Sequence, residues 1–326
     1  MEIPTPKSRG LRYWGIFSLM LFTWSFLFLN SVSILRSSIN LFNFLVVAAL
    51  FYAGTALLTA YRDTRPARFP IFHEDPDILG IRIKEVSFKS RDGVELSGWY
   101  ITPRNGAVII LTHGFGGNRL LMLRYARLFS QHGYGVLMYD LRSHGRSQAS
   151  LNTWGWLEIY DLLGAVDFVR SRPDGGRHIG AFGLSLGGQI SLRAAEQNEK
   201  IQAVAADGPS VASLQDHLLT PGLTLRKVIF YPWYWMLYNF ETLLTGVRQP
   251  AGVAEIIGRL APRPVMLIAA GRGGERQVVH HFFDLASEPK ELLEVPEARH
   301  GEAINARPDE YKSKLLAFFD RALLVD

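Results

Sequence analysis

One stretch near the middle of the chain restricts the possible folds more than any other. Residues 179–182 form a short apolar run that is typical of a buried strand, and apolar residues from Leu186 to Ala194 follow at helical spacing. Between them, residues 183–187 read GLSLG, with glycines where a side chain would obstruct a close approach of strand and helix. This order predicts a strand, a sharp turn that presents Ser185, and a helix. A simple glycine-rich turn without a catalytic serine is the alternative, and the rest of the sequence must distinguish the two.

Short apolar runs alternate with helical patterns throughout the C-terminal part of the chain. Residues 84–90 and 94–102 alternate in polarity around Arg91-Asp92-Gly93 and predict a hairpin. Further apolar runs of strand length follow at 107–112, 135–139, 178–182, 201–206, 264–270 and 291–295. This alternation predicts an α/β fold with a mostly parallel central sheet and helices on both faces.

The N-terminal residues have a different composition. Residues 13–35 and 38–61 contain no charged side chain, and each run is long enough for a membrane span of about 20 residues. Arg36 and the polar residues around it mark a turn between the two runs. We therefore expect a membrane anchor of two transmembrane helices within residues 1–65, followed by a linker at 66–83. A buried hairpin of a soluble protein and a cleaved signal peptide ahead of a single span are the alternatives.

The net charge of +5 is confined to the first 68 residues, and the remainder is neutral. Basic residues precede the first expected span and follow the second, which places both flanks on the cytoplasmic side. We therefore expect a multi-pass membrane protein with a cytoplasmic C-terminal domain. A nucleic-acid partner is not expected, because the folded domain has no excess of basic residues. The chain has no cysteine, which excludes disulfides, thiol catalysis and cysteine-ligated zinc.

If Ser185 is a nucleophile, it requires a histidine base and a carboxylate that orients the base. His300 is the candidate base, because it lies in the loop after the last predicted strand, where the order serine, acid, histidine places it. Glu275 is the first carboxylate after the strand at 264–270, and Asp207, at the end of the preceding strand, is the alternative acid. Either carboxylate could fix the histidine tautomer and stabilise the imidazolium ion.

An oxyanion hole requires backbone N–H groups close to the nucleophile. The glycine-rich segment HGFGGN at 113–118 directly follows a predicted strand and could present such groups. The expected donors are the N–H of Phe115 and the N–H of Leu186, next to Ser185. An ordinary turn is the alternative. A phosphate loop is not expected, because neither a Walker lysine nor G-x-G-x-x-G spacing is present.

From about residue 84 to its end the chain resembles the α/β-hydrolase superfamily, particularly its esterase and serine-aminopeptidase-like branch. The resemblance rests on HGFGGN at 113–118, YDLRSHGRS at 139–147, GLSLGG at 183–188 and RHG at 299–301. Two positions depart from the family pattern. Ser143 replaces a glycine, and Gly274 occupies the usual place of the acid, with Glu275 one residue later. The resemblance implies an α/β-hydrolase domain over 84–326 with a helical lid insert at about 209–263.

These residues together predict a membrane-anchored serine hydrolase that forms an acyl-enzyme and needs neither a metal nor an organic cofactor. Residues 230–240 of the insert read FYPWYWMLYNF, which favours an apolar or lipid-like ester as the small-molecule substrate. The same residues could instead lie at a membrane interface or simply pack the lid. A serine peptidase or amidase with the same triad, and a non-catalytic interaction module of the same fold, are the rival functions.

Overall fold

The computed structural model describes residues 38–69, 71, 83–219 and 225–324. In this part of the chain, eight strands form one sheet in the order β1-β2-β4-β3-β5-β6-β7-β8. Strands β3 to β8 are parallel, and the β1–β2 hairpin joins β4 in antiparallel orientation. The strands are β1 (Lys84–Lys89), β2 (Glu95–Ile101), β3 (Ala107–Thr112), β4 (Gly135–Tyr139), β5 (His178–Leu184), β6 (Ala203–Asp207), β7 (Val265–Ala270) and β8 (Lys290–Val295). Every predicted strand is present, with bounds that differ by two residues at most.

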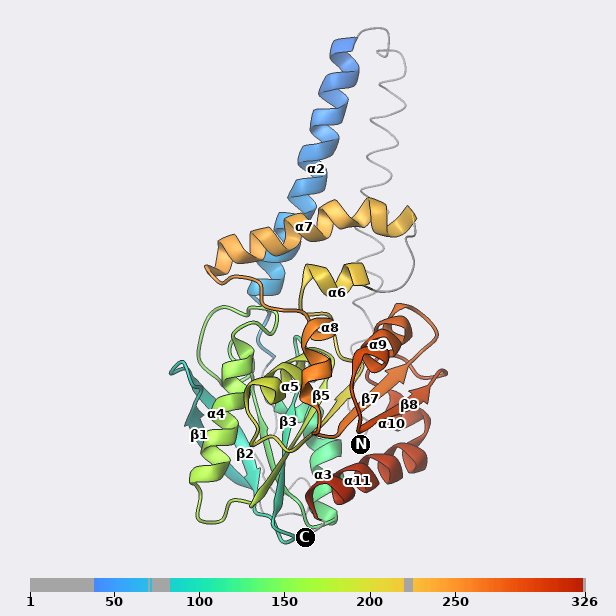
Figure 1. Ribbon diagram of the computed structural model, residues 1–326. Helices are drawn as coiled ribbons and strands as arrows, with labels where there is room; N and C mark the ends of the chain where they lie inside the picture. Colours follow the sequence, from blue (N-terminus) through green and yellow to red (C-terminus); the bar gives the residue numbers. More distant parts are fainter. Residues whose placement is uncertain (1–37, 70, 72–82, 220–224, 325–326) are drawn as a thin grey trace. The chain divides into compact units, whose positions relative to one another are not determined.

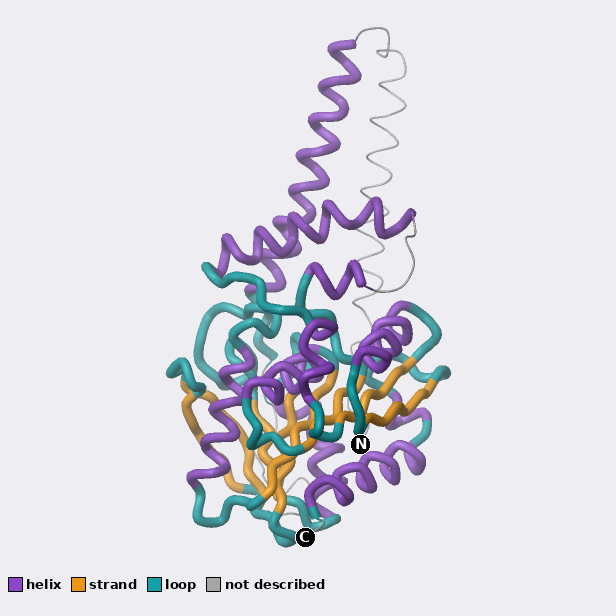
Figure 2. The backbone as a smooth tube through the Cα atoms, in the orientation of Figure 1, coloured by secondary structure: helices purple, strands orange, loops and turns teal. Residues whose placement is uncertain are grey.

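Helices cover both faces of this sheet, as Figure 1 and Figure 2 show. One core includes side chains of α4, α5 and α9, and the core on the other face includes side chains of α3 and α11. The helices are α2 (Ser38–Thr64), η2 (Arg119–Met122), α3 (Leu123–Gln131), α4 (Glu158–Ser171), α5 (Leu186–Gln197), α6 (Leu214–Leu219), α7 (Leu225–Thr245), α8 (Val253–Ile256), η3 (Ile257–Leu260), α9 (Gly274–Leu285), α10 (Ala303–Ala306) and α11 (Pro308–Leu323). The predicted mostly parallel sheet with helices on both faces is confirmed.

Strand β3 explains why the central strands read as continuous apolar runs. Val108 and Ile110 belong to the core beneath α4 and α5, whereas Ile109 and Leu111 belong to the core beneath α3 and α11. Every residue of this strand is buried. A parallel strand covered on both faces has no solvent side, so the alternation of polar and apolar residues disappears.

Helix α2 contains the second predicted span. Residues Phe42–Thr64 are long and apolar enough to cross a membrane, and in the described part of the chain no other helix has this property. The first predicted span, at 13–35, lies outside the described residues, so the two-helix hairpin stays a prediction. The chain divides into two compact units, Met1–Thr55 and Ala56–Asp326, and the boundary falls within α2.

Candidate active site

Ser185 occupies the sharp turn between β5 and α5. Its φ of 56° lies in the left-handed region, which is strained for a residue with a side chain. A Cβ atom at Gly183 would overlap the carbonyl oxygen of Gly187, and one at Gly187 would overlap the carbonyl oxygen of Thr112. Both positions therefore require glycine. The turn is held to the end of β6, because the N–H of Ser185 donates to the carbonyl oxygen of Asp207 at 2.8 Å.

His300 and Glu275 form a hydrogen-bonded pair. Nδ1–H of His300, in the loop between β8 and α10, donates to Oε2 of Glu275 at 2.6 Å. Glu275 lies in the first turn of α9, and its Oε1 accepts the N–H of Ala270 at 3.1 Å. The hydrogen bond with Glu275 raises the pKa of His300 above 6.5, although partial burial opposes it. The His300 side chain remains 52% exposed, so water partly screens the pair.

Asp207 lies at the end of β6 and has a different partner. Its Oδ2 accepts the hydroxyl of Tyr311 at 2.7 Å, and its Oδ1 has no hydrogen-bond partner within the described ranges. The side chain is fully buried, and this burial raises the pKa of Asp207 to about 6. Of the two carboxylates predicted as the acid, the structure brings Glu275 and not Asp207 into a hydrogen bond with His300.

The backbone of Gly208 places the His300–Glu275 pair next to the turn that carries Ser185. A Cβ atom at Gly208 would lie 2.7 Å from Oε1 of Glu275 and 3.0 Å from Nδ1 of His300. Gly208 directly follows Asp207, whose carbonyl oxygen accepts the N–H of Ser185. The end of β6 therefore contacts both the serine turn and the histidine–carboxylate pair.

The loop that carries His300 is also held by a side chain of α3. Nη2 of Arg124, on α3, donates to the carbonyl oxygen of Gly301 at 2.8 Å. Gly301 also lies near the serine turn, because a Cβ atom built on it would lie 3.4 Å from Cδ1 of Leu184, the residue before Ser185. The hydrogen bond from Arg124 ties the loop of His300 to α3.

Two buried histidines hold the glycine-rich segment after β3, and sequence reasoning assigned neither of them a role. Nε2 of His113 accepts the N–H of Leu141 at 3.0 Å. The proton therefore resides on Nδ1, which lies 2.8 Å from the carbonyl oxygen of Gly114 and donates to it. Burial, which disfavours the charged ring, lowers the pKa of His113 to about 3. His113 is thus a neutral link between the ends of β3 and β4.

His144 makes a second link between the segment after β3 and the segment after β4. Its Nε2 accepts the N–H of Gly116 at 3.2 Å, and its Nδ1 donates to the carbonyl oxygen of Arg142 at 2.8 Å. Burial lowers the pKa of His144 as well. Both histidines lie in the segments HGFGGN and YDLRSHGRS, which the sequence singled out. Each accepts a backbone N–H that is 28 residues away in the chain, and these hydrogen bonds depend on the adjacent placement of β3 and β4.

The predicted oxyanion donors are the N–H groups of Phe115, in the glycine-rich segment after β3, and Leu186, at the start of α5. Leu186 is the first residue of α5, so its N–H has no intrahelical acceptor. Within the described ranges, the N–H of Phe115 and that of Leu186 donate to no other group. The ring of Phe115 packs between His144 and Trp154, with centroid distances of 6.1 Å and 5.0 Å. The loop that presents the Phe115 N–H is therefore fixed by both backbone and ring contacts.

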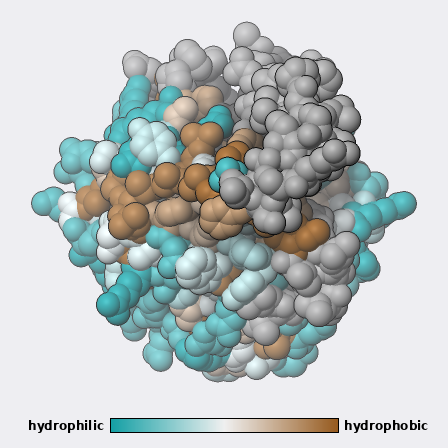
Figure 3. Space-filling view, turned by 90° about the horizontal axis from the view of Figure 1, so that it is seen from above, coloured by the Kyte–Doolittle hydropathy of each residue, from teal (hydrophilic) through white to brown (hydrophobic). Residues whose placement is uncertain are grey.

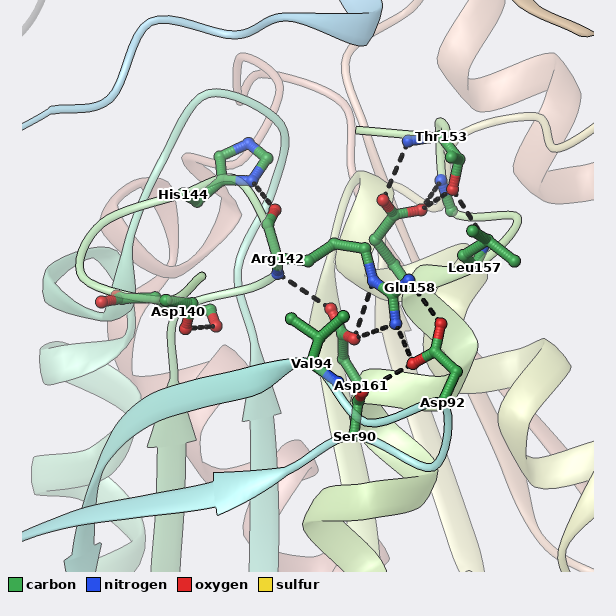
Figure 4. A network of polar contacts seen from close by, with 12 residues as sticks. Ser90, Asp92, Val94, Asp140, Arg142, His144, Thr153, Leu157, Glu158 and Asp161 are labelled. Carbon is green, nitrogen blue, oxygen red and sulfur yellow. Dashed lines mark hydrogen bonds and ion pairs between the residues drawn. The ribbon is translucent and has the colours of Figure 1, made fainter. Parts of the chain in front are cut away.

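A buried ion network anchors the loop that bears His144, as Figure 4 shows. Arg142 donates to Asp161 of α4 from its N–H, Nε and Nη2, at 2.8, 2.9 and 2.6 Å. Its Nη1 and Nη2 also reach Asp92, in the turn between β1 and β2, at 2.7 and 2.6 Å. Arg142 is 3% exposed and Asp161 is fully buried, so this network fixes the loop from the interior.

The sheet order and the helices on both of its faces have the arrangement of the alpha/beta hydrolase fold. A family model described as alpha/beta hydrolase fold matches residues 107–243. The solved structure of the esterase Pf2001 from Pyrococcus furiosus is 26% identical, with a TM-score of 0.65, and the match covers 80% of this chain and 98% of that one. The chain therefore has the alpha/beta hydrolase fold, and this neighbour supports a hydrolase of esterase type.

Two curated proteins extend the comparison. The uncharacterized protein YfhR of Escherichia coli strain K12 is 27% identical over 294 residues, which cover 84% of this chain and 94% of YfhR. The thiohydrolase aneE of Aspergillus aculeatus is 28% identical over 149 residues, which cover 44% of this chain and 47% of aneE.

Across the described residues, no group of three or more histidine, aspartate and glutamate side chains could hold a metal ion.

Proposed function

We propose that this chain is a membrane-anchored serine hydrolase that cleaves carboxylic esters with an apolar or lipid-like acyl group. Ser185 is the nucleophile, His300 the general base and Glu275 the carboxylate that orients the base. The observation that carries the proposal is the 2.6 Å hydrogen bond between His300 and Glu275, beside the strained turn of Ser185. A nucleophile, a base and an orienting acid in this order are what acyl transfer requires.

The first half of the reaction forms an acyl-enzyme. Nε2 of His300 takes the Ser185 hydroxyl proton while Oγ attacks the carbonyl carbon of the ester. The carbonyl π electrons move to oxygen, and the N–H groups of Phe115 and Leu186 stabilise this oxyanion. When the tetrahedral intermediate collapses, the bond to the alcohol oxygen breaks, and the alcohol leaves with the proton from His300.

The second half releases the acid. His300 takes a proton from water as the water oxygen attacks the acyl carbon, and the oxyanion again lies at the N–H groups of Phe115 and Leu186. Collapse breaks the bond to Oγ, and His300 returns the proton to Ser185. Glu275 stays ionised throughout and stabilises the imidazolium form of His300 in both halves.

The assignment of Glu275 over Asp207 is supported by their partners. Glu275 accepts Nδ1–H of His300, whereas Asp207 accepts the hydroxyl of Tyr311. Burial also raises the pKa of Asp207 to about 6, which favours the neutral form near neutral pH more than for an ordinary carboxyl group. The orienting acid must stay charged beside the imidazolium ion, so the raised pKa of Asp207 is evidence against that residue.

The proposed location is a membrane, with the catalytic domain on the cytoplasmic side. Support comes from α2, which is long and apolar enough to cross a membrane, and from Arg62 in its last turn and Arg65 and Arg68 after it. A reporter fused after Asp326 should behave as cytoplasmic, and extraction should require detergent. Periplasmic or extracellular reporter activity would contradict the orientation, and release by salt alone would contradict the anchor.

Labelling with a fluorophosphonate probe tests the proposed nucleophile. Ser185→Ala should abolish labelling and ester hydrolysis, because no hydroxyl remains to attack. Ser171→Ala, at an exposed position at the end of α4, is the matched control and should leave both unchanged. Labelling that persists in Ser185→Ala would refute the assignment. A matched pair of p-nitrophenyl ester and p-nitroanilide with the same acyl group then separates an esterase from an amidase.

A further inference from the structure

Helix α7, in the chain between β6 and β7, exposes a face of large apolar side chains. Phe230 is 41% exposed, Tyr231 39%, Trp235 52% and Leu243 76%. Asn239, also exposed, lies one helical turn after Trp235 and is polar but uncharged. Several large apolar side chains exposed on one side of a helix are typical of an interaction site.

The opposite side of α7 is fixed against the rest of the domain, so this orientation of the helix is defined. Tyr238 is 3% exposed, its ring stacks on Trp156 at a centroid distance of 6.3 Å, and its hydroxyl lies 3.1 Å from Nε2 of His217. Leu237 and Glu241 are buried beside it. Because these buried side chains pack against the domain, the exposed apolar side chains of α7 point away from it.

The last turns of α2 continue the apolar surface. Leu57 is 42% exposed, and Leu58 and Tyr61 are each 51% exposed, in the same compact unit as α7. Burial raises the pKa of Glu241, on α7, to about 8, and the nearby carboxyl group of Asp63, on α2, contributes to this shift. This electrostatic interaction links the end of α2 to the inward side of α7. Figure 3, which views the molecule from above, shows apolar side chains gathered on this face.

The exposed charged side chains at the ends of these two helices are basic, whereas Asp63 of α2 is only partly exposed. Arg62 and Arg65 are exposed at the end of α2, and Arg248 is exposed three residues after α7. Glu241, the single acidic residue of α7, is 3% exposed and lies on the inward side. Tryptophan and tyrosine accumulate at the level of lipid headgroups, and exposed basic residues are attracted to anionic headgroups. This combination fits a phospholipid surface better than a protein partner.

We propose that α7 lies in the surface of a lipid bilayer, with Phe230, Tyr231, Trp235 and Leu243 inserted at the headgroup boundary. The contact itself is independent of the proposed hydrolysis. Its consequence, that the enzyme takes its ester from the bilayer rather than from water, rests on the proposed function.

Spin labelling tests the contact, because the chain has no cysteine that would be labelled as background. The full chain carries a nitroxide at Trp235→Cys or, as the matched control, at Ser313→Cys on the exposed side of α11. Each variant is reconstituted into phosphatidylcholine vesicles that contain a minority of phosphatidylglycerol. Collisions with oxygen, which concentrates in the bilayer, are compared with collisions with a water-soluble nickel chelate.

We expect the label at 235 to collide preferentially with oxygen and the label at 313 to collide preferentially with the nickel chelate. Equal behaviour of the two labels would overturn the proposal, because α7 would then be in water. Exclusion of both reagents from 235 would also overturn it, since a protein surface, such as a second copy of this chain, would then cover the helix.

A kinetic test addresses the source of the substrate. In the double variant Trp235→Asp/Leu243→Asp, two charges replace apolar side chains on the proposed lipid face. Hydrolysis of a water-soluble short-chain ester should stay within about twofold, whereas hydrolysis of a long-chain ester embedded in vesicles should fall at least about tenfold. Equal rates of native and variant protein on the vesicle substrate would contradict delivery from the bilayer. If the native chain hydrolyses neither ester, the proposed function fails, while the spin-label result still decides whether α7 contacts lipid.

Discussion

Replacement of Glu275 by glutamine tests the hydrogen bond on which the proposed triad depends. Glutamine has the same shape, and its amide oxygen can still accept the N–H of Ala270, as Oε1 of Glu275 does at 3.1 Å. The change removes the negative charge that stabilises the imidazolium ion of His300. It also removes the carboxylate that fixes the tautomer of the neutral ring. An acid-to-amide change in a serine-protease triad lowers kcat by about 10⁴. Because His300 is 52% exposed and water screens the pair, we expect a loss of roughly 10³ to 10⁴.

The pH dependence provides a second readout of the same change. Only neutral His300 can accept the Ser185 proton, so kcat/KM falls as the pH drops through the pKa of His300. In the native chain the hydrogen bond to Glu275 raises this pKa above 6.5. Without the carboxylate the pKa falls, and the acid limb should move to lower pH in Glu275→Gln. The assay is kcat/KM for a soluble ester between about pH 5 and 9.

Asp207→Asn is the matched control, because it makes the same chemical change in the second carboxylate. Asp207 accepts the hydroxyl of Tyr311 rather than a proton of His300, so we expect a kcat loss of about tenfold or less. Its charge also raises the pKa of His300, so a small shift of the acid limb in the same direction is expected. A large loss in Asp207→Asn with a small loss in Glu275→Gln would reverse the assignment. Near-normal rates in both variants would leave at most a dyad of Ser185 and His300.

Three further substitutions test other parts of the site. Gly208→Ala should lower kcat without unfolding the chain, since its Cβ would lie 2.7 Å from Oε1 of Glu275; circular dichroism checks the fold. His144→Phe removes the acceptor of the Gly116 N–H, so kcat should fall about tenfold or more with KM nearly unchanged in steady-state assays. Arg142→Met leaves Asp161 buried without its cation and should destabilise the domain by about 3–5 kcal/mol in urea unfolding; an unchanged midpoint would refute this reading.

The sheet could be predicted from the sequence because each central strand has an apolar run of its own, bounded by turn residues. Strand β3 shows this directly. Because the strand is buried on both faces, residues 107–111 are all apolar, and the apolar run with Thr112 at its end predicted the bounds of the strand. The turn at Ser185 was predictable because its geometry requires particular residue types. A side chain at Gly183 or at Gly187 would overlap a backbone carbonyl group, so both positions must be glycine.

The partners within the site could not be derived from order along the chain. Glu275 and Asp207 both follow strand ends, and only the path of the loops after β6, β7 and β8 decides which carboxylate meets His300. The links made by His113 and His144 depend on the placement of β4 beside β3, which a linear pattern does not specify. Their roles in catalysis, like that of Ser185, stay predictions.

The left-handed backbone of Ser185 has a consequence for the evolution and engineering of this chain. A residue with a side chain at φ 56° holds strain of about 1–3 kcal/mol, and glycine would relieve it. Ser185→Gly should therefore unfold at a higher temperature while losing the proposed nucleophile. Selection for thermal stability alone would favour inactive sequences at this position, so any such selection must also demand turnover if the serine is to be retained.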